Sequence, residues 1–213
     1  MAISKPHCTK KELLAILGSD WAERGDIKKA LEQAHCSHRY HVRDDGSSYL
    51  EQHIYPIVCE VLRYLPDTSL RETLVIVTLL HDVLEEDPTV TPQMLFDDYG
   101  KEVVSLLLEL QKIRKDKVAR TQEDRHDEHV SFGARLEKAS SLCRVIKTLD
   151  RINNVECTEG HLNPEKYRRF IQDTEEVYLP IAAQLDNSLA ERMSRGIDRI
   201  KAELLALKST NVK

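Results

Sequence analysis

Apolar residues recur at helical spacing along almost the whole chain. The first group, Leu13 to Leu17, follows Thr9 and Glu12, whose three-residue spacing is that of a capping box at a helix start. The same periodicity predicts further helices at residues 26–40, 50–64, 69–85, 91–98, 100–113, 131–156, 164–185 and 187–209. No segment alternates as a half-buried strand would. The pattern therefore predicts an all-α fold.

The segment Leu74 to Leu80 is apolar on every side. Periodicity alone does not separate a buried helix from a buried strand here, but the continuous run from Arg71 to Glu85, without Gly or Pro, favours a helix. A helix that is apolar all round lies in the middle of a bundle. It brings His81 and Asp82 to its C-terminal end, before Pro88 prevents continuation.

The stretch 111–130 is intensely charged, which favours a solvated helix extension or a flexible loop over a lid that closes on a ligand. No internal repeat or linker divides the chain, so we expect one domain, residues 1–213. The amphipathic face from Leu189 to Leu207, in the C-terminal helix 187–209, either completes the core or forms a homo-oligomer contact.

Composition narrows the classes of partner. The chain has 31 Lys and Arg against 36 Asp and Glu, a net charge of -5, so no general basic surface indicates nucleic acid or an anionic membrane as partner. No run of 18 apolar residues and no signal peptide occurs. The five Cys include no Cys-x-x-Cys pair, which is typical of reduced thiols in a cytoplasmic protein.

The His81-Asp82 pair is the first candidate for chemistry. An ionised carboxylate beside an imidazole at the end of so apolar a helix is costly to bury unless something compensates both. A divalent cation with mixed nitrogen and oxygen ligands does so. The alternative at this stage is a His-Asp hydrogen bond that caps the helix.

Two further ligand candidates lie on apolar helices, His53 upstream and Asp150 downstream. Asp150 projects from a stripe of core-facing residues, where an unpaired acid would be expensive. Its alternative role is a salt bridge with Arg151 or Arg144. The alternative for His53 is a hydrogen-bonded histidine at a helix N-terminus.

Four motifs occur in one order along this helical scaffold. They are ALEQAHCSH at 30–38 followed by Arg43, Gly46, Tyr49 and His53; LLHDVLEED; IKTLDRINN; and DTEEVYLPIA at 173–182. From about residue 30 to 185 they resemble the HD superfamily of metal-dependent phosphohydrolases, in particular the hydrolase domain of Rel/Spo-type (p)ppGpp enzymes and the stand-alone small alarmone hydrolases. The resemblance implies a single HD-type helical bundle.

The resemblance also implies roles for individual residues. His53, His81, Asp82 and Asp150 become ligands of a divalent metal, which in that family is usually manganese. Glu85 and Glu86 become the catalytic acids that orient and deprotonate the attacking water, a sensible task for a carboxylate beside a metal site. Otherwise they are exposed acids at the unfavourable negative end of a helix dipole.

For the substrate, the resemblance implies that Arg43 holds a phosphate, Asn154 lies near the ribose and Tyr178 helps to seat the nucleoside. A solvated loop arginine is the alternative for Arg43. The histidines at 35, 38 and 41 could suggest a second metal site, but no Cys or acid completes it, so packing and loop roles are favoured.

The sequence departs from the family pattern in the loop and in two motifs. Asp44 follows Arg43 where the family usually has a basic residue, and Asp45 comes next. We therefore expect guanosine tetraphosphate to be hydrolysed, but less efficiently than by typical members of the family. His53 is the fourth residue after Tyr49, whereas in the family the metal-binding His is the third residue after the Tyr. On a helix both spacings place the two side chains on one face. The family's His-Asn pair is Asn153-Asn154 here.

The function that follows is metal-dependent hydrolysis of a small phosphorylated nucleotide. The leading substrate by resemblance is guanosine 3′,5′-bis(diphosphate), from which the enzyme would remove the 3′-pyrophosphate. The alternatives are an HD phosphatase acting on another nucleotide or phosphoester, and a non-catalytic HD-fold sensor or interaction module.

Overall fold

The computed structural model describes residues 5–66, 69–113, 121–159 and 164–210. Within these ranges the regular elements are helices, and the only β-type pairing is an isolated bridge between Val42 and Ser48. None of the described helices is long and apolar enough to cross a membrane. The prediction of an all-α bundle is therefore confirmed.

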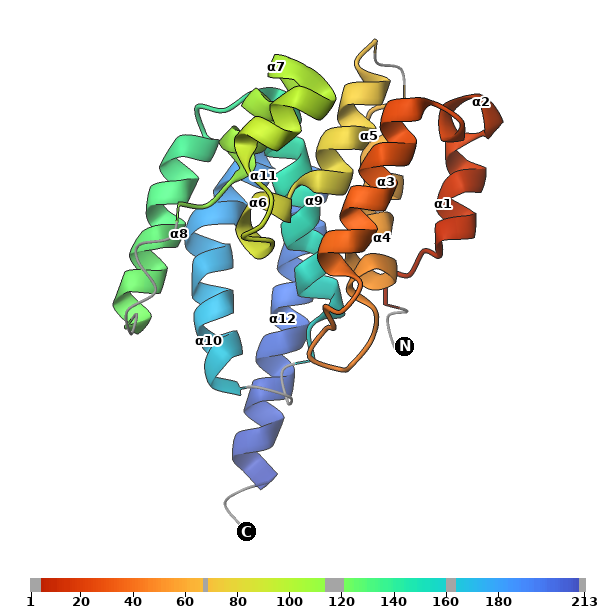
Figure 1. Cartoon of the computed structure of the whole chain (residues 1–213). Coiled ribbons are helices and arrows are strands. Elements are labelled where there is room, and N and C mark those ends of the chain that lie inside the picture. Colours follow the sequence, from red (N-terminus) through yellow and green to blue (C-terminus); the bar gives the residue numbers. More distant parts are fainter. Residues whose placement is uncertain (1–4, 67–68, 114–120, 160–163, 211–213) are drawn as a thin grey trace.

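Figure 1 shows the order of the helices along the chain. Their bounds are α1 Lys10–Leu17, α2 Ser19–Ala22, α3 Gly25–His38, the π-helix η1 Leu50–Ile54, α4 Tyr55–Tyr64, α5 Arg71–Leu80, α6 Val83–Glu86, α7 Pro92–Leu110, α8 Gln122–Leu136, α9 Ser141–Cys157, α10 Pro164–Asp173, the π-helix η2 Thr174–Tyr178, α11 Leu179–Leu185 and α12 Asn187–Thr210.

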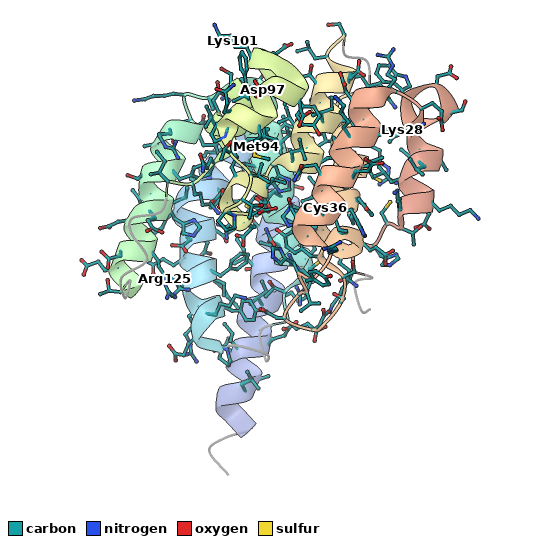
Figure 2. All side chains as sticks on the ribbon, in the orientation of Figure 1. Lys28, Cys36, Met94, Asp97, Lys101 and Arg125 are labelled. Carbon is teal, nitrogen blue, oxygen red and sulfur yellow. The ribbon has the colours of Figure 1, made fainter. Side chains whose placement is uncertain are left out.

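Two helices form the centre of the bundle. Helix α5 packs against α3, α4 and α7, and every residue from Leu74 to Leu80 is buried, as the apolar run predicts. Helix α9 packs against α4, α7, α11 and α12. Side chains fill the space between the helices, whereas the exposed Lys28, Lys101 and Arg125 lie at the edge of the molecule in Figure 2. The two central helices are thus held on several sides.

Two predicted helices are wrong in their extent. The predicted helix 131–156 is divided at residues 137–140, because the Ser140 hydroxyl accepts a hydrogen bond from the Cys143 N–H and starts α9 anew. The predicted helix 69–85 ends at Leu80, and His81 and Asp82 form a turn before α6. By contrast, the predicted interruption between 91–98 and 100–113 is confirmed, since Gly100 has a φ of 80° inside α7.

The charged stretch 111–130 is partly helical. Helix α8 begins inside it with a capping box between Thr121 and Asp124, which the sequence analysis overlooked. Residues 114–120 of this stretch lie outside the described residues. The face of α8 that carries His126 and His129 packs on α10 and η2, so at least this part of the stretch belongs to the bundle.

The extra residue between Tyr49 and His53 lies where η1 begins. The Tyr55 N–H donates to the Leu50 carbonyl, five residues back, so the turn is wider than in an α-helix. The rings of Tyr49 and His53 are 4.6 Å apart, which confirms that both share one face. A π-turn thus accommodates the insertion without turning His53 away.

Candidate metal centre

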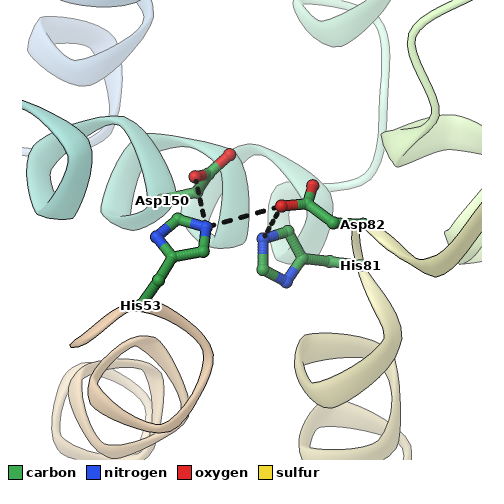
Figure 3. A group of neighbouring side chains, drawn as sticks. All are labelled: His53, His81, Asp82 and Asp150. Carbon is green, nitrogen blue, oxygen red and sulfur yellow. Dashed lines mark ion pairs between the residues drawn. The ribbon is translucent and has the colours of Figure 1, made fainter. Parts of the chain in front are cut away.

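Three separate parts of the fold bring the four predicted metal ligands together. His53 comes from η1, His81 and Asp82 from the turn that ends α5, and Asp150 from α9. One ligand atom of each residue lies within 4.8 Å of the others (Figure 3). The group is largely buried, so its charges are held away from solvent.

Hydrogen bonds at Nδ1 fix both imidazoles so that the Nε2 atom of each ring faces the carboxylates of the group. The Nδ1 of His53 lies 2.8 Å from the Asn153 side-chain oxygen, and the Nδ1 of His81 lies 2.8 Å from the Thr78 carbonyl. Because these oxygens can only accept, each Nδ1 carries the hydrogen and each Nε2 keeps a lone pair. Such a partner for the outer nitrogen is typical of metal-binding histidines.

The inward Nε2 atoms meet carboxylate oxygens. The Nε2 of His53 lies 3.4 Å from Asp82 Oδ2 and 3.4 Å from Asp150 Oδ1, and the Nε2 of His81 lies 3.3 Å from Asp82 Oδ2. The His81 Nε2 is buried and has no hydrogen-bond partner. Lone pairs that face anionic oxygens repel one another unless a cation lies between them, so the residues fit a divalent metal with two nitrogen and two oxygen ligands.

The pKa values of the group agree with this need for positive charge. Burial raises the pKa of the Asp82 carboxyl, but His81 and Lys147 outweigh it and hold that pKa well below its usual value. For His81, burial lowers the imidazole pKa while Asp82 raises it, and the pKa ends above its usual value. The space between carboxylate and imidazole therefore favours a cation.

Lys147 is a member of the site that the sequence analysis missed. Its side chain is 1% exposed, and its Nζ lies 3.1 Å from Asp82 Oδ1 and 3.2 Å from Asp150 Oδ2. Burial lowers the pKa of Lys147, but the surrounding carboxylates outweigh it and hold the pKa well above its usual value. The ammonium thus binds the outer oxygen of each carboxylate, whereas the inner oxygens face the imidazoles and accept hydrogen bonds from the Tyr49 hydroxyl and from Asn154. The three-residue spacing of Lys147 and Asp150 on one helix was the available signal.

Glu85 and Glu86 follow the ligands on the short helix α6. The Glu85 side chain is only 5% exposed, its Oε1 accepts a hydrogen bond of 2.9 Å from the Lys112 N–H, and it lies 4.0 Å from the Lys147 Nζ. Glu86 is exposed on the neighbouring position. Both line a cavity of 380 Å³ that also reaches Asp82 and Asp150. The buried, oriented Glu85 is therefore more than an exposed acid at a helix end.

The lining of this cavity also includes a set of cations, here called the cationic wall. Its positive side chains come from the charged stretch, from α9 and from α10, and they are Lys112, Arg151, Lys166 and Arg169. His129, Phe170 and Asp173 line the cavity as well. A cavity lined both by metal ligands and by cations suits a phosphate group. This wall was not predicted from the sequence, because its cationic side chains come from separate elements.

A second, smaller cavity of 210 Å³ adjoins the first, and Tyr49, Asn154, Lys166 and Phe170 line both. Arg43 lines the smaller one and donates a hydrogen bond of 2.9 Å to the Asn154 side-chain oxygen. Asn154 in turn donates to Asp150 Oδ1 at 2.7 Å. Arg43 and Asn154, both predicted to contact substrate, therefore lie together beside the metal ligands.

Tyr178 differs from its expected position. Its side chain is buried and lines neither cavity, because the ring packs beneath the Arg151 guanidinium at 3.8 Å. The Tyr178 hydroxyl lies 3.2 Å from the Nδ1 of His129. In this arrangement Tyr178 supports the wall of the cavity instead of touching a nucleoside.

The two acids beside Arg43 are not isolated negative charges. Asp44 accepts from Lys166 at 2.6 Å and from the Tyr167 hydroxyl, and Asp45 accepts from Lys5 at 2.5 Å. These lysines offset much of the repulsion that the sequence suggested for a phosphorylated ligand. The effect of Asp44 on phosphate binding stays a prediction, now with Lys166 as part of it.

Among the described residues, the histidines at 35, 38 and 41 form no group with acids that could hold a metal ion. His35 is exposed, whereas His38 is buried and its Nδ1 lies 3.1 Å from the Nδ1 of His41. The rings of His38 and Tyr49 are 5.2 Å apart. This agrees with the predicted packing and loop roles.

Comparisons with known proteins agree with this geometry. Residues 30–187 match the family model described as HD domain. The chain is similar to a GTP pyrophosphokinase of Myxococcus xanthus, with 30% identity over 189 residues, 88% of this chain and 23% of that protein. It is also similar to a guanosine-3′,5′-bis(diphosphate) 3′-pyrophosphohydrolase of Haemophilus influenzae, with 31% identity over 173 residues, 80% of this chain and 23% of that protein.

The chain thus spans 23% of the length of these curated relatives. A solved structure of a metazoan ortholog of SpoT, described as hydrolysing ppGpp, superposes with a TM-score of 0.64. That alignment covers 84% of this chain and 97% of the other at 21% identity, so it supports the fold. Because the family model matches most of its length, this chain belongs to the HD-domain family.

Proposed function

We propose that this chain is a metal-dependent phosphohydrolase that removes the 3′-pyrophosphate from guanosine 3′,5′-bis(diphosphate). The observation that carries the proposal is the buried group of two imidazoles and two carboxylates around the unpartnered Nε2 of His81. The names of the relatives support the choice of nucleotide. The cationic wall, which lines the same cavity as Asp82 and Asp150, supports a substrate rich in phosphate.

His53, His81, Asp82 and Asp150 would hold the cation, since imidazole and carboxylate together suit a divalent metal. For its identity we propose Mn²⁺, which the resemblance to the Rel/Spo-type enzymes implies. A divalent metal supplies Lewis-acid activation of the phosphoryl group and of the attacking water. Glu85 accepts the proton of that water, since its Oε1 is held beside the ligands by the Lys112 N–H. Glu86, on the exposed side of α6, helps to orient the water.

The cationic wall takes the charge of the leaving group. Lys112, Arg151 and Arg169 line the 380 Å³ cavity together with the acids, so they can neutralise a departing pyrophosphate. Arg43 and Asn154 bind the nucleotide where the two cavities meet, with Arg43 on a phosphate and Asn154 near the ribose. Tyr178 contributes indirectly, through the His129 ring.

The test is a panel of nucleotides incubated with the purified chain and Mn²⁺, with release of phosphate and of pyrophosphate measured separately. The panel contains guanosine 3′,5′-bis(diphosphate), a nucleoside monophosphate and a dinucleotide cofactor carrying an extra phosphate. We expect pyrophosphate from the first compound, and none after the metal is removed with a chelator. Metal content is measured on the same samples.

The other outcomes identify the rival functions. Phosphate release from another member of the panel would indicate an HD phosphatase with a different substrate. Stoichiometric metal without turnover of any nucleotide would indicate a non-catalytic sensor or interaction module. Either result would contradict the proposed reaction.

A further inference from the structure

Two buried cysteines meet on the side of the bundle that carries α1. Cys8 belongs to the segment before α1 and Cys59 to α4, 51 positions away, yet their Sγ atoms are 3.2 Å apart. Their exposed fractions are 5% and 3%. The other three thiols lie elsewhere, with Cys36 exposed and Cys143 and Cys157 bonded to backbone carbonyls. Contact between two thiols so distant in sequence is a feature that the phosphohydrolase reaction does not use.

A small molecule can reach this pair. A cavity of 390 Å³ is lined by both cysteines, by Pro6 of the segment before α1, and by residues of α1 and α4, among them Pro56 and Arg63. The space exceeds that needed for a water-sized reagent. The two sulfurs are therefore buried, but a small reagent in the cavity can contact them.

We propose that Cys8 and Cys59 are an oxidation site that closes to a disulfide on reaction with hydrogen peroxide. The Cys8 thiolate attacks a peroxide oxygen, the O–O bond breaks, and Cys8 becomes a sulfenic acid with release of one water. The Cys59 sulfur then displaces the hydroxyl group, so that an S–S bond forms, the S–O bond breaks and a second water leaves. The two thiols lose two electrons and two protons in total, and the peroxide is reduced to two waters.

The order of the steps follows from the surroundings of each thiol. Burial raises the pKa of both, and it raises that of Cys59 to about 12. Cys8 is therefore the first to supply a thiolate, and Cys59 the resolving thiol. Because both pKa values are raised, the reaction is slower than at an exposed, acidic thiol.

The disulfide would restrain the N-terminal segment, which contacts two elements that carry residues of the candidate site. The Cys8 N–H donates a hydrogen bond of 2.9 Å to the Glu51 carbonyl in η1, the helix that carries His53. Lys5, in the same segment, pairs with Asp45 of the loop that carries Arg43. Oxidation thus links the N-terminal segment covalently to α4, beside η1 and the loop that carries Arg43. A cross-link between positions so far apart in sequence also lowers the conformational entropy of the unfolded chain, which stabilises the fold.

The test treats the full chain with hydrogen peroxide, blocks remaining thiols by alkylation and maps peptides by mass spectrometry. We expect a peptide joining Cys8 to Cys59, lighter by two hydrogen atoms and released by dithiothreitol. The melting temperature should rise by about 5 °C on oxidation and return on reduction. The Cys36→Ser variant should behave as the parent, whereas Cys59→Ser and Cys8→Ser should show neither change.

The proposal is overturned if Cys8 and Cys59 are both alkylated after treatment that oxidises the exposed Cys36. It is equally overturned if the rise in melting temperature persists in Cys59→Ser. Since the readouts are a cross-link and a melting temperature, they do not depend on the activity proposed above.

Discussion

The two π-helices arise from the same local sequence feature but serve the site differently. Both η1 and η2 have five residues, and each is followed within two residues by a proline, Pro56 after η1 and Pro180 after η2. Proline has no N–H to give to the carbonyl four residues back. In each case the N–H of the residue before the proline donates to the carbonyl five residues back. These bonds run from Tyr55 to Leu50 and from Leu179 to Thr174. The widened turn is thus a local consequence of sequence.

Tertiary packing makes the two turns different. In η1 the Gln52 carbonyl, which Pro56 leaves without its helical donor, accepts a bond of 3.1 Å from Asn153 of α9. The same Asn153 side chain orients His53. In η2 the ring of Tyr178 is covered by Arg151 and bonded to His129 of α8. A widened turn can therefore aim a side chain, but its neighbouring helix decides whether that side chain serves the metal or the cavity wall.

The largest effect should come from the carboxylate ligands. We expect Asp82→Ala and Asp150→Ala each to abolish metal binding and activity, because one anionic ligand is lost and Lys147 is left undercompensated. Both variants should remain helical, since buried apolar surface supplies most of the folding free energy. Metal content after dialysis and circular dichroism check this. Glu176→Ala in η2 is the control and should keep its metal; a ligand variant with stoichiometric metal would refute the four-ligand site.

The next effect concerns the proposed base. Glu85→Gln keeps the shape of the side chain but removes its ability to take a proton. We expect metal content near that of the parent and a loss of about 10²–10⁴ in kcat. Steady-state kinetics on the substrate found in the panel provide the measurement. An unchanged kcat would assign the proton to another group.

The comparison between the π-helices is sharpest at Asn153 and Tyr178. Asn153→Ala frees the His53 ring and the Gln52 carbonyl, so metal affinity should fall by about 10–100-fold. Tyr178→Phe removes only the hydroxyl that meets His129, so metal affinity should stay at the parent value while KM changes. Metal titration of both variants separates the two roles. Equal losses of metal affinity would mean that η1 and η2 are not distinct.

A stability effect is expected where α8 packs on η2. A Cβ at Gly133 would collide with the Cγ1 of Val177, so Gly133→Ala should destabilise the fold by about 1–3 kcal/mol. Gly25→Ala is the matched control, because a Cβ there meets nothing within 4 Å. Urea unfolding measures both. If Gly133→Ala were as stable as Gly25→Ala, the contact between α8 and η2 would be looser than described.

The smallest effect is on the pH dependence of stability. Burial lowers the pKa of His129 to about 2, and Lys112 and Arg151 add to the shift. Below about pH 6.5 the unfolded chain therefore binds a proton that the folded chain excludes. As the pH is lowered further, the free energy of unfolding falls by about 1.4 kcal/mol for each pH unit. His129→Gln should reduce this slope by that amount between pH 6 and 4. An identical slope in the variant would show that His129 is charged when folded.

Several features of the fold could be predicted from the sequence because they are local. The capping box at Thr9, the all-round apolar run of α5 and the interruption at Gly100 each depend on residues close in sequence. The division at Ser140 was missed although its signal was also local, because the apolar periodicity of α8 and α9 continues across it.

For the site, the sequence by itself supplied the candidate ligands, since a buried His81-Asp82 pair needs compensation wherever it lies. Only the tertiary structure decided which other side chains complete the site. Lys147 reaches two carboxylates at once, and Lys112, Arg151 and Arg169 form one wall, because α9 packs across the bundle and brings separate elements to one cavity. Tyr178 carries a matching motif, yet the packing of Arg151 over its ring removes it from the cavity. Residue type is set by sequence, whereas distance and direction between remote side chains are set by how the helices pack.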